Sequence, residues 1–434
     1  MSDQPNQSFP RFAYKGMTLA SRNVAVMPTS TIALYEHLSI FGTPEPYFNS
    51  IRHLKKVLDE NELHGRGGAA FPLSQKLKGY ESHIGEVVII ANGCEGEYLS
   101  HKDEVLLQRH PHLVLDGMAI LGSALDVKAG YVHVKASQTS VQSVVKRALA
   151  ERGPLNPFKI EVTTSVPGVG YIAGAETAVI SAINRQGGLP VYFPDRPILR
   201  GVRKLPTLTA NVETLAHLAL LARFGSTWFS SVGTAEDSGT RLLTITLPDG
   251  SYTVVEVVAG SAFSEVFSAL GVSPNQVSCG LLGGYFGQIV DVERLWGLRA
   301  SQADLKKSGF SFGAGVVALA SGCPIEETAA VLRYLAGESA GQCGPCYLGL
   351  PELARAWSEL RPGKAHSRSI SRVSELCDEI AGRGACSMPD GAVLLARSSL
   401  SRFRAELLAH QSGTCGYTSS AGRLVPRQGA MVAR

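Results

Sequence analysis

The 434-residue sequence predicts an α/β protein that ends in a helical region. Between Glu86 and about Leu221, apolar β-like runs alternate with helical patterns, which is typical of a mainly parallel sheet covered by helices. Near residue 235 the pattern changes to short strands joined by turns. After Ile325 the apolar residues have helical spacing and β-branched runs are few. These patterns predict three domains, over residues 1–235, 236–305 and 306–434.

The first domain is expected to contain a helix over Ile51–Asn61, whose apolar residues recur at helical spacing. The apolar run Val87–Ala91 predicts a buried strand. After it we expect a helix over His112–Leu125, a strand over Gly130–Val134 and a helix over Ser140–Arg152.

The second domain is expected to open on a β-hairpin. The runs Thr240–Leu247 and Ser251–Val258 flank an Asp249-Gly250 turn. A short helix at Ser261–Leu270 and a glycine-rich strand region near Gly280–Val290 complete a small β-grasp-like module. The third domain then has one more strand-like run, over residues 316–320, before its helices begin.

Composition and charge exclude several classes of protein. The chain is 44% hydrophobic and 18% charged, which is ordinary for a globular protein. Its net charge of +4 is too small for its size to indicate nucleic-acid binding. No apolar run of about eighteen residues is present, and the N-terminal residues lack the apolar core of a signal peptide. We therefore expect a cytoplasmic protein, in which clustered cysteines serve metal or redox chemistry rather than a disulfide framework.

One segment is rich in glycine and flanked by cations. It reads GRGGAAFP over residues 65–72 and is followed by Lys76. Glycine lets another molecule approach the main chain closely. Main-chain N–H groups that lead into a helix attract phosphate, as do the charges of Arg66 and Lys76. Taken alone, the segment fits both a phosphate site and an ordinary tight turn.

A cysteine cluster lies near the C-terminal end. Cys343 and Cys346 are separated by two residues, and Cys386 follows about forty residues later. Two thiolates at this spacing hold one edge of a metal centre, and a third from a later loop completes an iron–sulfur site. A zinc site and the absence of a metal remain open from the spacing alone. A thioredoxin-type dithiol is disfavoured, because the pair lies in a helical region rather than after a βαβ strand.

Seven motifs follow one another between residues 50 and 410. They are GRGGAAFP with Lys76 (65–76), NGCEGEYLSHKDEVLL (92–107), HPHLVLDGMAI (110–120), GVGYIAGAETA (168–178), LPTLTANVETLA (205–216), ESAGQCGPC (338–346) and the late Cys386. Together they resemble the flavin-bearing, NADH-oxidising subunit of respiratory complex I and its soluble relatives. The segment NGCEGEYL also resembles its counterpart in the C subunit of the Rnf complex.

The resemblance implies a Rossmann-like FMN-binding domain, an SLBB-like β-grasp domain and a helical domain with one [4Fe–4S] cluster. The residues it assigns to FMN are Gly65, Arg66, Gly67, Gly68, Lys76, Asn92, Glu95, Glu97, Gly174, Glu176 and Asn211. It brings Tyr171 and the two candidate catalytic carboxylates, Glu97 and Glu176, toward the nicotinamide nucleotide, NADH or NADPH. It assigns the cluster to Cys343, Cys346 and Cys386. Other interpretations stay open, with Glu95 and Glu97 as loop-surface carboxylates and Tyr171 as a core residue.

The sequence departs from the family pattern at several places. The first cysteine of the family's C-x-x-C-x-x-C is Ala340 here, which leaves the cluster incomplete unless Cys377, Cys415 or water substitutes. An aspartate near the flavin is replaced by Cys94 and a glutamate by Ala175, which is expected to raise the flavin potential. The aromatic clamp for the adenine ring is not evident in residues 191–197.

Three hypotheses follow from these features. The first is an NADH dehydrogenase-like oxidoreductase that passes electrons from NAD(P)H through FMN and the cluster to an iron–sulfur partner. It would belong to a multisubunit complex, in the cytoplasm or held by partner subunits on the cytoplasmic face of a membrane. The second is an FMN electron-transfer subunit that exchanges electrons with a ferredoxin or another subunit and does not use NADH. The third is a structural subunit that has lost its redox centres.

Overall fold

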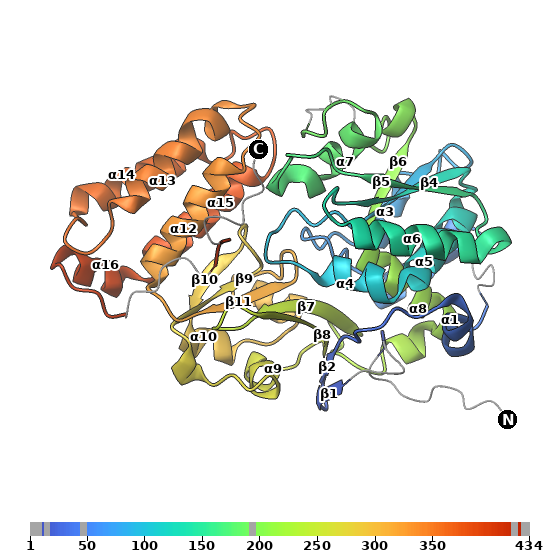
Figure 1. Cartoon of the computed structure of the whole chain (residues 1–434), viewed down its shortest axis with the longest axis horizontal. Coiled ribbons are helices and arrows are strands. Elements are labelled where there is room, and N and C mark those ends of the chain that lie inside the picture. Colours follow the sequence, from blue (N-terminus) through green and yellow to red (C-terminus); the bar gives the residue numbers. More distant parts are fainter. Residues whose placement is uncertain (1–10, 13–17, 44–49, 191–196, 418–423, 427–434) are drawn as a thin grey trace.

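Two sheets and a group of C-terminal helices make up the computed structural model, which describes residues 11–12, 18–43, 50–190, 197–417 and 424–426. Figure 1 shows the first sheet with its helices on the right, the second sheet at the lower centre and the C-terminal helices on the left. This arrangement confirms the predicted α/β class with a parallel sheet and a helical C-terminal region.

The first sheet has four parallel strands in the order β5-β4-β3-β6. Their bounds are β3 Val88–Asn92, β4 Ala129–Val134, β5 Lys159–Thr164 and β6 Thr207–Asn211. Along β3, Ile89 and Ala91 pack into one apolar core, and Val88 and Ile90 pack into another on the opposite face. Successive side chains of a strand point to opposite faces, so the continuous apolar run reflects a strand that is covered on both sides.

Helices from before, between and after these strands cover the sheet. Their bounds are α1 Leu34–Phe41, α2 Ile51–Asn61, α3 Leu73–Lys78, α4 Lys102–Arg109, α5 Pro111–Leu125, α6 Thr139–Arg152, α7 Glu176–Ile183 and α8 Val212–Phe229. α5 is apolar nearly all round because it is buried between the sheet and its neighbouring helices. The predicted helices at 51–61, 112–125 and 140–152 and the predicted strands at 87–91 and 130–134 are confirmed within one residue at each end.

A buried ion cluster joins the helices beneath this sheet. Asp116 of α5 is fully buried and forms ion pairs with Arg152 of α6 at 2.8 Å and with Arg223 of α8. His37 of α1 contacts the same carboxylate at 2.7 Å. Burial alone would raise the pKa of Asp116, but His37 and the two guanidinium groups outweigh it and hold that pKa well below its usual range. Asp116 therefore stays ionised and fixes four helices at one point.

The second sheet has seven strands in the order β1-β2-β8-β7-β11-β9-β10. Their bounds are β1 Thr18–Ser21, β2 Val24–Val26, β7 Thr240–Thr246, β8 Tyr252–Val258, β9 Cys279–Leu282, β10 Gln288–Asp291 and β11 Val316–Ala320. β7 and β8 form the predicted antiparallel hairpin. α9 Phe263–Ala269, α10 Val292–Gly297 and α11 Gln302–Lys307 contribute Phe263, Leu295 and Leu305 to the core on one face.

The helical region covers the other face of the second sheet. Its elements are α12 Pro324–Gly337, a π-helical turn at Pro345–Gly349, α13 Leu350–Ser358, α14 Ser367–Ile380, α15 Met388–Arg402 and α16 Arg404–Gln411. Trp357 is completely buried among these helices, and its Nε1–H donates to the Ile325 carbonyl at 2.9 Å. The predicted helical pattern after Ile325 is confirmed.

The seven-stranded sheet crosses two of the expected domain limits. β11 falls within the expected third domain, but it pairs in parallel with β7 and antiparallel with β9. β1 and β2 precede the first sheet in sequence, yet β2 pairs with β8. Local sequence patterns do not show which distant strands pair with one another. The expected domain limits at residues 235 and 305 therefore separate strands that belong to one sheet. No helix among the described residues is both long and apolar enough to cross a membrane.

The ion cluster generates a prediction about stability. Replacement of Asp116 by alanine would leave two buried guanidinium groups without their counter-charge, and we expect a loss of about 3–5 kcal/mol in the free energy of unfolding. Asp378→Ala, which removes an exposed Asp–Arg pair on α14, should cost less than about 1 kcal/mol. Urea unfolding followed by circular dichroism measures both, and equal effects would contradict the role of Asp116.

A buried histidine predicts how stability depends on pH. Burial lowers the pKa of His133, on β4, from 6.5 to about 4. The folded protein therefore keeps His133 neutral where the unfolded chain takes up a proton, and this contribution to stability falls as pH drops from about 6.5 to about 4. His133→Gln should remove about 2 kcal/mol of the stability difference between pH 7.5 and pH 5. His366→Gln, at an exposed site, should leave that difference unchanged in urea titrations at the two pH values.

Candidate functional site

The carboxyl edge of the parallel sheet gathers three of the expected site segments. β3 ends at Asn92 and β6 ends at Asn211, and these residues are register partners. The glycine-rich loop reaches the same edge, because a Cβ atom on Gly67 would lie 3.3 Å from Asn211 Cβ. Ligands of open parallel sheets bind beyond the carboxyl ends of the strands. The segments therefore meet where such a sheet presents a ligand site.

Arg66 is buried inside the glycine-rich loop, with 6% of its surface exposed. Its main-chain N–H donates to Thr214 Oγ1 at 2.9 Å, and one terminal guanidinium nitrogen donates to the Thr240 carbonyl at 3.3 Å. Nε and the other terminal nitrogen have no hydrogen-bond partner among the described residues. Together with Lys102 and Arg241, Arg66 lines a small cavity between the loop and the second sheet. A buried guanidinium with unused donors suits an anionic ligand.

Gly65 and Gly68 shape the same loop. The Gly65 N–H donates to the Phe71 carbonyl at 2.9 Å, which closes the loop on itself. Gly68 has a φ of +118°, a backbone conformation that favours glycine. The backbone conformation accounts for Gly68 without a ligand, and a Cβ atom on Gly65 would lie only 3.2 Å from the Phe71 carbonyl oxygen. The loop is therefore a tight turn as well as a candidate cradle.

Lys76 and Glu176 form an ion pair across the edge of the sheet. Lys76 Nζ lies 3.1 Å from Glu176 Oε1 and also donates to the Thr209 carbonyl at 2.6 Å. The two side chains are 30% and 38% exposed. Of the three expected site carboxylates, Glu176 is the one that a solvent-borne ligand reaches, because Glu95 and Glu97 are buried.

The loop that follows β3 packs tightly against residues 170–175. Asn92 Nδ2 donates to the Gly174 carbonyl at 3.0 Å, and Asn92 Oδ1 accepts from the Cys94 N–H at 3.1 Å. A Cβ atom on Gly174 would lie 2.2 Å from the Cys94 carbonyl oxygen, so only glycine fits there. Asn92 and Gly174 therefore meet, as the resemblance implies.

Cys94 and Ala175 make this edge less negative than two carboxylates would. Cys94 is buried, and burial raises the pKa of its thiol to about 12, so the thiol remains neutral. Ala175 is the N-cap of α7 and offers no side-chain oxygen to the helix. The edge lacks both negative charges that the family pattern would place there.

Glu95 stabilises the start of α4. Its Oε1 accepts hydrogen bonds from the Ser100 hydroxyl and from the Asp103 N–H, the latter at 3.2 Å. Oε2 accepts from the Glu104 N–H at 3.4 Å. A carboxylate that satisfies the free N–H groups of a helix start is favoured there. Glu95 is thus a buried residue rather than a loop-surface one, and its contact with FMN stays a prediction.

Lys102 forms a charged network beneath the site. Its ammonium group lies 2.6 Å from Asp103 Oδ1 and 2.9 Å from Glu213 Oε2, and all three side chains are buried. Asn211 Nδ2 donates to Asp103 Oδ2 at 2.5 Å, and Glu213 Oε1 accepts from the Leu242 N–H of β7 at 2.9 Å. The network joins the ends of the first sheet to the second sheet.

The two carboxylates of this network differ in protonation. Burial raises the pKa of Asp103 to about 7, although Lys102 opposes the shift. Burial acts in the same direction on Glu213, but Lys102, His217 and Arg66 together outweigh it and hold the pKa of Glu213 well below its usual range. Near neutral pH, Asp103 is therefore the group of the network that exchanges a proton most readily.

Glu97 and Tyr171 contact each other in the interior. Glu97 Oε2 accepts from the Tyr171 hydroxyl at 2.9 Å and from the Tyr285 N–H at 2.7 Å, and Oε1 accepts from the Leu99 N–H at 3.2 Å. Burial raises the pKa of Glu97. The Tyr171 ring also packs against those of Tyr285 and Phe286. Contact of Glu97 or Tyr171 with a nucleotide stays a prediction.

Cys343, Cys346 and Cys386 converge at the junction with the helical region. The thiols of Cys343 and Cys346 share a hydrogen bond, and Cys386 lies close enough to interact electrostatically with both. Partial burial raises the pKa of Cys343, but the N–H groups of Ala385 and Cys346 outweigh it and lower that pKa. This convergence gives the expected three thiols one common site.

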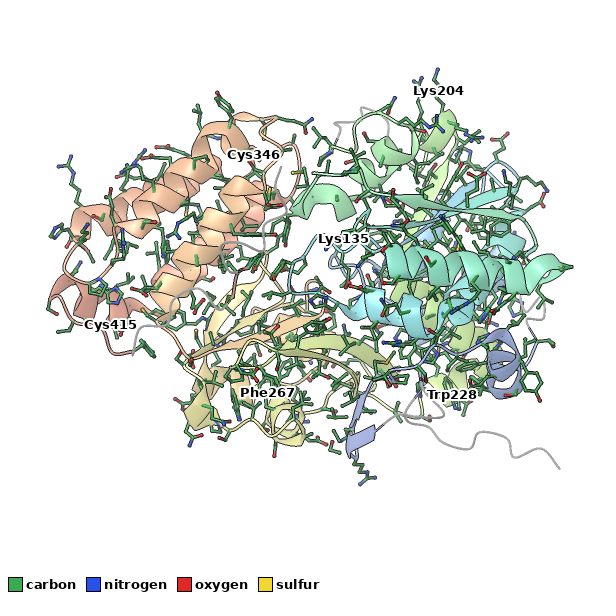
Figure 2. All side chains as sticks on the ribbon, viewed as in Figure 1. Lys135, Lys204, Trp228, Phe267, Cys346 and Cys415 are labelled. Atoms are coloured by element: carbon green, nitrogen blue, oxygen red, sulfur yellow. The ribbon has the colours of Figure 1, made fainter. Side chains whose placement is uncertain are left out.

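Neither expected substitute for the missing fourth cysteine joins this site. Cys377 is fully buried on α14, and its charged neighbours are Arg397 and Asp378. Cys415 belongs to a different group of side chains, and Figure 2 places Cys346 and Cys415 in separate parts of the helical region. The expectation for Cys415 is therefore wrong, because the helices hold it away from Cys346.

The cysteine segment and the loop before α7 are in direct contact. The Tyr171 N–H donates to Glu338 Oε2 at 3.1 Å, where Glu338 begins the cysteine motif. A Cβ atom on Gly170 would lie 1.5 Å from the same oxygen, so this contact requires glycine at 170. The rings of Tyr285 and Tyr334 meet nearby with centroids 5.1 Å apart. The loop before α7 and the segment that carries Cys343 and Cys346 are thus held against each other.

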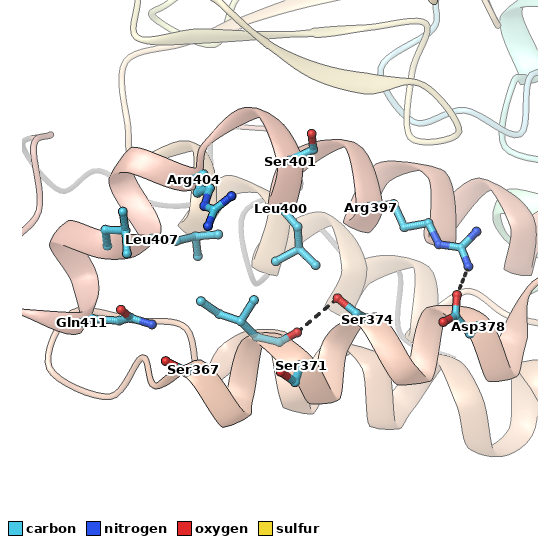
Figure 3. Close-up of a pocket in the computed structure, with 12 residues that line it drawn as sticks. Ser367, Ser371, Ser374, Asp378, Arg397, Leu400, Ser401, Arg404, Leu407 and Gln411 are labelled. Atoms are coloured by element: carbon cyan, nitrogen blue, oxygen red, sulfur yellow. Dashed lines mark hydrogen bonds and ion pairs between the residues drawn. The ribbon is translucent and has the colours of Figure 1, made fainter.

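An open groove between α14, α15 and α16 contains none of the expected site residues (Figure 3). Serine side chains and Leu400 line it, and the Arg397–Asp378 ion pair closes one end. It has no convergent set of nucleophilic or metal-binding groups, so we assign no function to it.

Sequence reasoning missed several residues of the site. Lys102, Asp103 and Glu213 lie inside the motifs at 92–107 and 205–216, but no local signal shows that they meet. Lys135, which follows β4, is close enough to Cys94 and Glu97 to influence the pKa of both, and it is labelled near the centre of Figure 2. Its position after a strand of the parallel sheet is the signal that would have found it. The expected adenine region at 191–196 lies outside the described residues.

Comparison with known proteins identifies related sequences and folds. Residues 58–220 match the model of the Nuo51 FMN-binding domain, and residues 326–410 match that of the NADH-ubiquinone oxidoreductase-F iron-sulfur binding region. The F 2 subunit of NADH-quinone oxidoreductase of Rhizobium meliloti is 27% identical over 370 residues, which are 82% of this chain and 88% of that protein. The F subunit of the Aquifex aeolicus enzyme is 26% identical over 365 residues, 80% of this chain and 84% of that one.

The fold is shared with a solved enzyme structure. A chain of the NAD+-reducing [NiFe]-hydrogenase in its H2-reduced state superposes with a TM-score of 0.74 at 23% identity. The match covers 88% of this chain but only 65% of the hydrogenase chain. The two family models match separate regions that together make up more than half of the 434 residues. The chain thus contains an FMN-binding region and an iron–sulfur binding region of the NADH-ubiquinone oxidoreductase type, and it is similar to the F subunits of NADH-quinone oxidoreductase over most of its length.

Proposed function

We propose that this chain is an FMN- and iron–sulfur-dependent electron-transfer subunit of a multisubunit complex. It would accept electrons from NAD(P)H at FMN and pass them through the C-terminal cluster to an iron–sulfur partner protein. The observation that carries the proposal is the meeting of the glycine-rich loop, Asn92 and Asn211 at one sheet edge, beside the loop that contacts the cysteine segment. The names of the relatives, which are NADH-quinone oxidoreductase subunits, support the same interpretation.

Within this proposal the three expected domains keep their roles. The parallel sheet and its helices would form a Rossmann-like FMN domain, and the β7–β8 hairpin with α9, β9 and β10 an SLBB-like unit. Because β11 pairs with β7 and β9, the SLBB-like unit would extend to Ala320. The helices from α12 onward would form the iron–sulfur domain.

The residues at the sheet edge fit FMN. Arg66 lines a small cavity beside the loop, and its two unused nitrogen donors suit the phosphate. Gly65, Gly67 and Gly68 leave the main chain open to close approach, and Asn92 and Asn211 end the strands beside them. FMN, when bound, accepts two electrons together and releases them singly. Lys76, Asn92, Gly174 and Asn211 would hold and orient it.

The charge distribution favours a raised flavin potential. The neutral Cys94 thiol and Ala175 take the places of two carboxylates. Lys135 and Arg66 add positive charge to the same edge. Fewer negative groups near a flavin favour its reduced, more negative forms.

The thiols fit part of an iron–sulfur site. Cuboidal clusters have four irons, each held by one cysteine thiolate. Cys343, Cys346 and Cys386 supply three, and Ala340 has no ligand atom. We therefore propose that this chain binds a cluster with one iron unsupported by a protein thiolate, which is held by water or is absent.

One observation favours the second hypothesis, in which FMN does not receive electrons from NADH. Two of the three residues expected near the nucleotide, Glu97 and Tyr171, use their polar atoms on each other and on Tyr285. Glu176 alone remains accessible among them. A nucleotide would therefore have fewer polar partners than the family pattern implies.

Cofactor analysis tests the proposal. Protein purified without air is expected to contain FMN, iron and acid-labile sulfide. Arg66→Met should weaken FMN binding about 10- to 100-fold, because it removes charge-assisted hydrogen bonds worth about 1.5–3 kcal/mol. Arg147→Met, which removes an exposed arginine of α6, should leave FMN affinity unchanged. A colourless, folded protein without sulfide would instead support the structural hypothesis.

The electron donor is tested by stopped-flow reduction. We expect NADH to bleach the flavin absorbance of the wild-type protein, and Glu176→Gln to slow that bleaching about tenfold through the loss of one charge-assisted hydrogen bond. Glu359→Gln, at an exposed ion pair on α13, is the matched control and should not change the rate. Absence of bleaching by NADH together with reduction by a reduced ferredoxin would overturn the NADH assignment in favour of the second hypothesis.

A further inference from the structure

A second group of metal-binding side chains lies away from the three thiols already described. It consists of Cys323, Glu406, His410 and Cys415, and their ligand atoms all lie within 4.8 Å of one another. The group joins two regions of the chain that are far apart in sequence. Cys323 is the N-cap of α12, Glu406 and His410 lie one turn apart on α16, and Cys415 follows α16.

The separations within the group lie on either side of those in a small tetrahedral site. His410 Nε2 lies 3.0 Å from Glu406 Oε1 and 3.5 Å from Cys323 Sγ, and Cys323 Sγ lies 4.0 Å from Glu406 Oε1. The Cys415 thiol contacts both Cys323 and Glu406. Zinc bonds of about 2.0–2.3 Å to nitrogen, oxygen and sulfur place tetrahedral ligand atoms about 3.3–3.8 Å apart.

His410 is oriented as metal-bound histidines are. Its side chain is fully buried, and Nδ1 lies 2.7 Å from the Leu360 carbonyl oxygen. That hydrogen bond puts the proton on Nδ1 and leaves the Nε2 lone pair directed toward the two thiols and Glu406. The Leu360 carbonyl thus fixes both the tautomer and the ring orientation before a metal binds.

We propose that Cys323, Glu406, His410 and Cys415 bind one structural zinc ion. Two thiolates, an imidazole nitrogen and a carboxylate oxygen complete a tetrahedral shell without an open position, which is the pattern of structural rather than catalytic zinc. An iron–sulfur cluster is disfavoured here, because the group offers only two thiolates. On binding, the two thiols release their protons to solvent and no electron is transferred.

The position of the group explains what the zinc would stabilise. Cys323 and His410 are buried, whereas Glu406 and Cys415 are partly exposed, so the ion has a route from solvent. The ion would link α16 and the segment after it to the first residues of α12. α12 leads at its other end to Glu338 and the cysteine motif, so the zinc would anchor the helix that carries the iron–sulfur segment. This inference does not depend on the proposed electron transfer.

Metal analysis of the full chain tests the proposal. Protein purified without chelators should contain one zinc per chain, measured by mass spectrometry of the elements, in addition to any iron. His410→Ala and Cys415→Ser should each lose the zinc and retain the iron. Cys377→Ser, a matched control at a buried cysteine outside both groups, should retain both metals, and Cys386→Ser should lower the iron content alone.

A measurement on the wild-type protein tests the proposal even if the variants do not fold. After removal of zinc by a chelator, addition of Co2+ should produce the intense visible absorption of tetrahedral cobalt bound to thiolate, and added zinc should raise the melting temperature. The proposal is overturned by a zinc-free protein that gives no cobalt spectrum, by zinc retained in both variants, or by a Cys323–Cys415 disulfide in peptide mass analysis.

Discussion

The site depends on the ion pairs that the buried ammonium group of Lys102 forms. That group compensates Asp103 at the start of α4 and Glu213 at the start of α8, and Glu213 in turn accepts a hydrogen bond from β7. Removal of one partner from a buried charge network leaves the others without compensation, which costs several kcal/mol. Asn211, at the end of β6, donates a hydrogen bond to Asp103 of the same network. The network therefore also fixes the position of the Asn211 side chain at the sheet edge. Stability and ligand geometry therefore depend on the same charges here.

Most acidic residues of the motifs serve the architecture around the site rather than its surface. Glu95 stabilises the start of α4, and Glu97 joins the loop after β3 to Tyr171 and to Tyr285 in the turn between β9 and β10. A carboxylate in the interior persists only where donors surround it. Both residues meet that condition through main-chain N–H groups and a hydroxyl. Glu176 is therefore the one carboxylate of the expected three that is accessible to solvent. A nucleotide that contacts an expected carboxylate would have to bind beside Glu176.

The described cysteines divide into distinct chemical roles. One group, Cys343, Cys346 and Cys386, converges close to the loop before α7. A second group, Cys323 and Cys415 with His410, converges at the other end of α12. Cys94 is buried as a neutral thiol, and Cys377 lies in the core of the helical region. A thiolate-rich site suits iron and sulfide, while mixed sulfur, nitrogen and oxygen ligands suit zinc. One helix, α12, thus connects two sites with different preferences for metals.

The sequence alone determined the class of the fold, because hydrophobic periodicity is a local property. The strand at β3, the helices α5 and α6 and the β7–β8 hairpin all follow from spacing within about twenty residues. It also indicated Arg66, Asn92, Asn211 and the three converging cysteines as candidate site residues, since each lies in a compact motif. Only the tertiary structure decided that β11 and β2 join the second sheet, that Glu97 is buried, and that Cys415 lies with His410 rather than with Cys346. These outcomes depend on pairings between residues that are tens to hundreds of positions apart, which are set by packing and charge compensation in three dimensions.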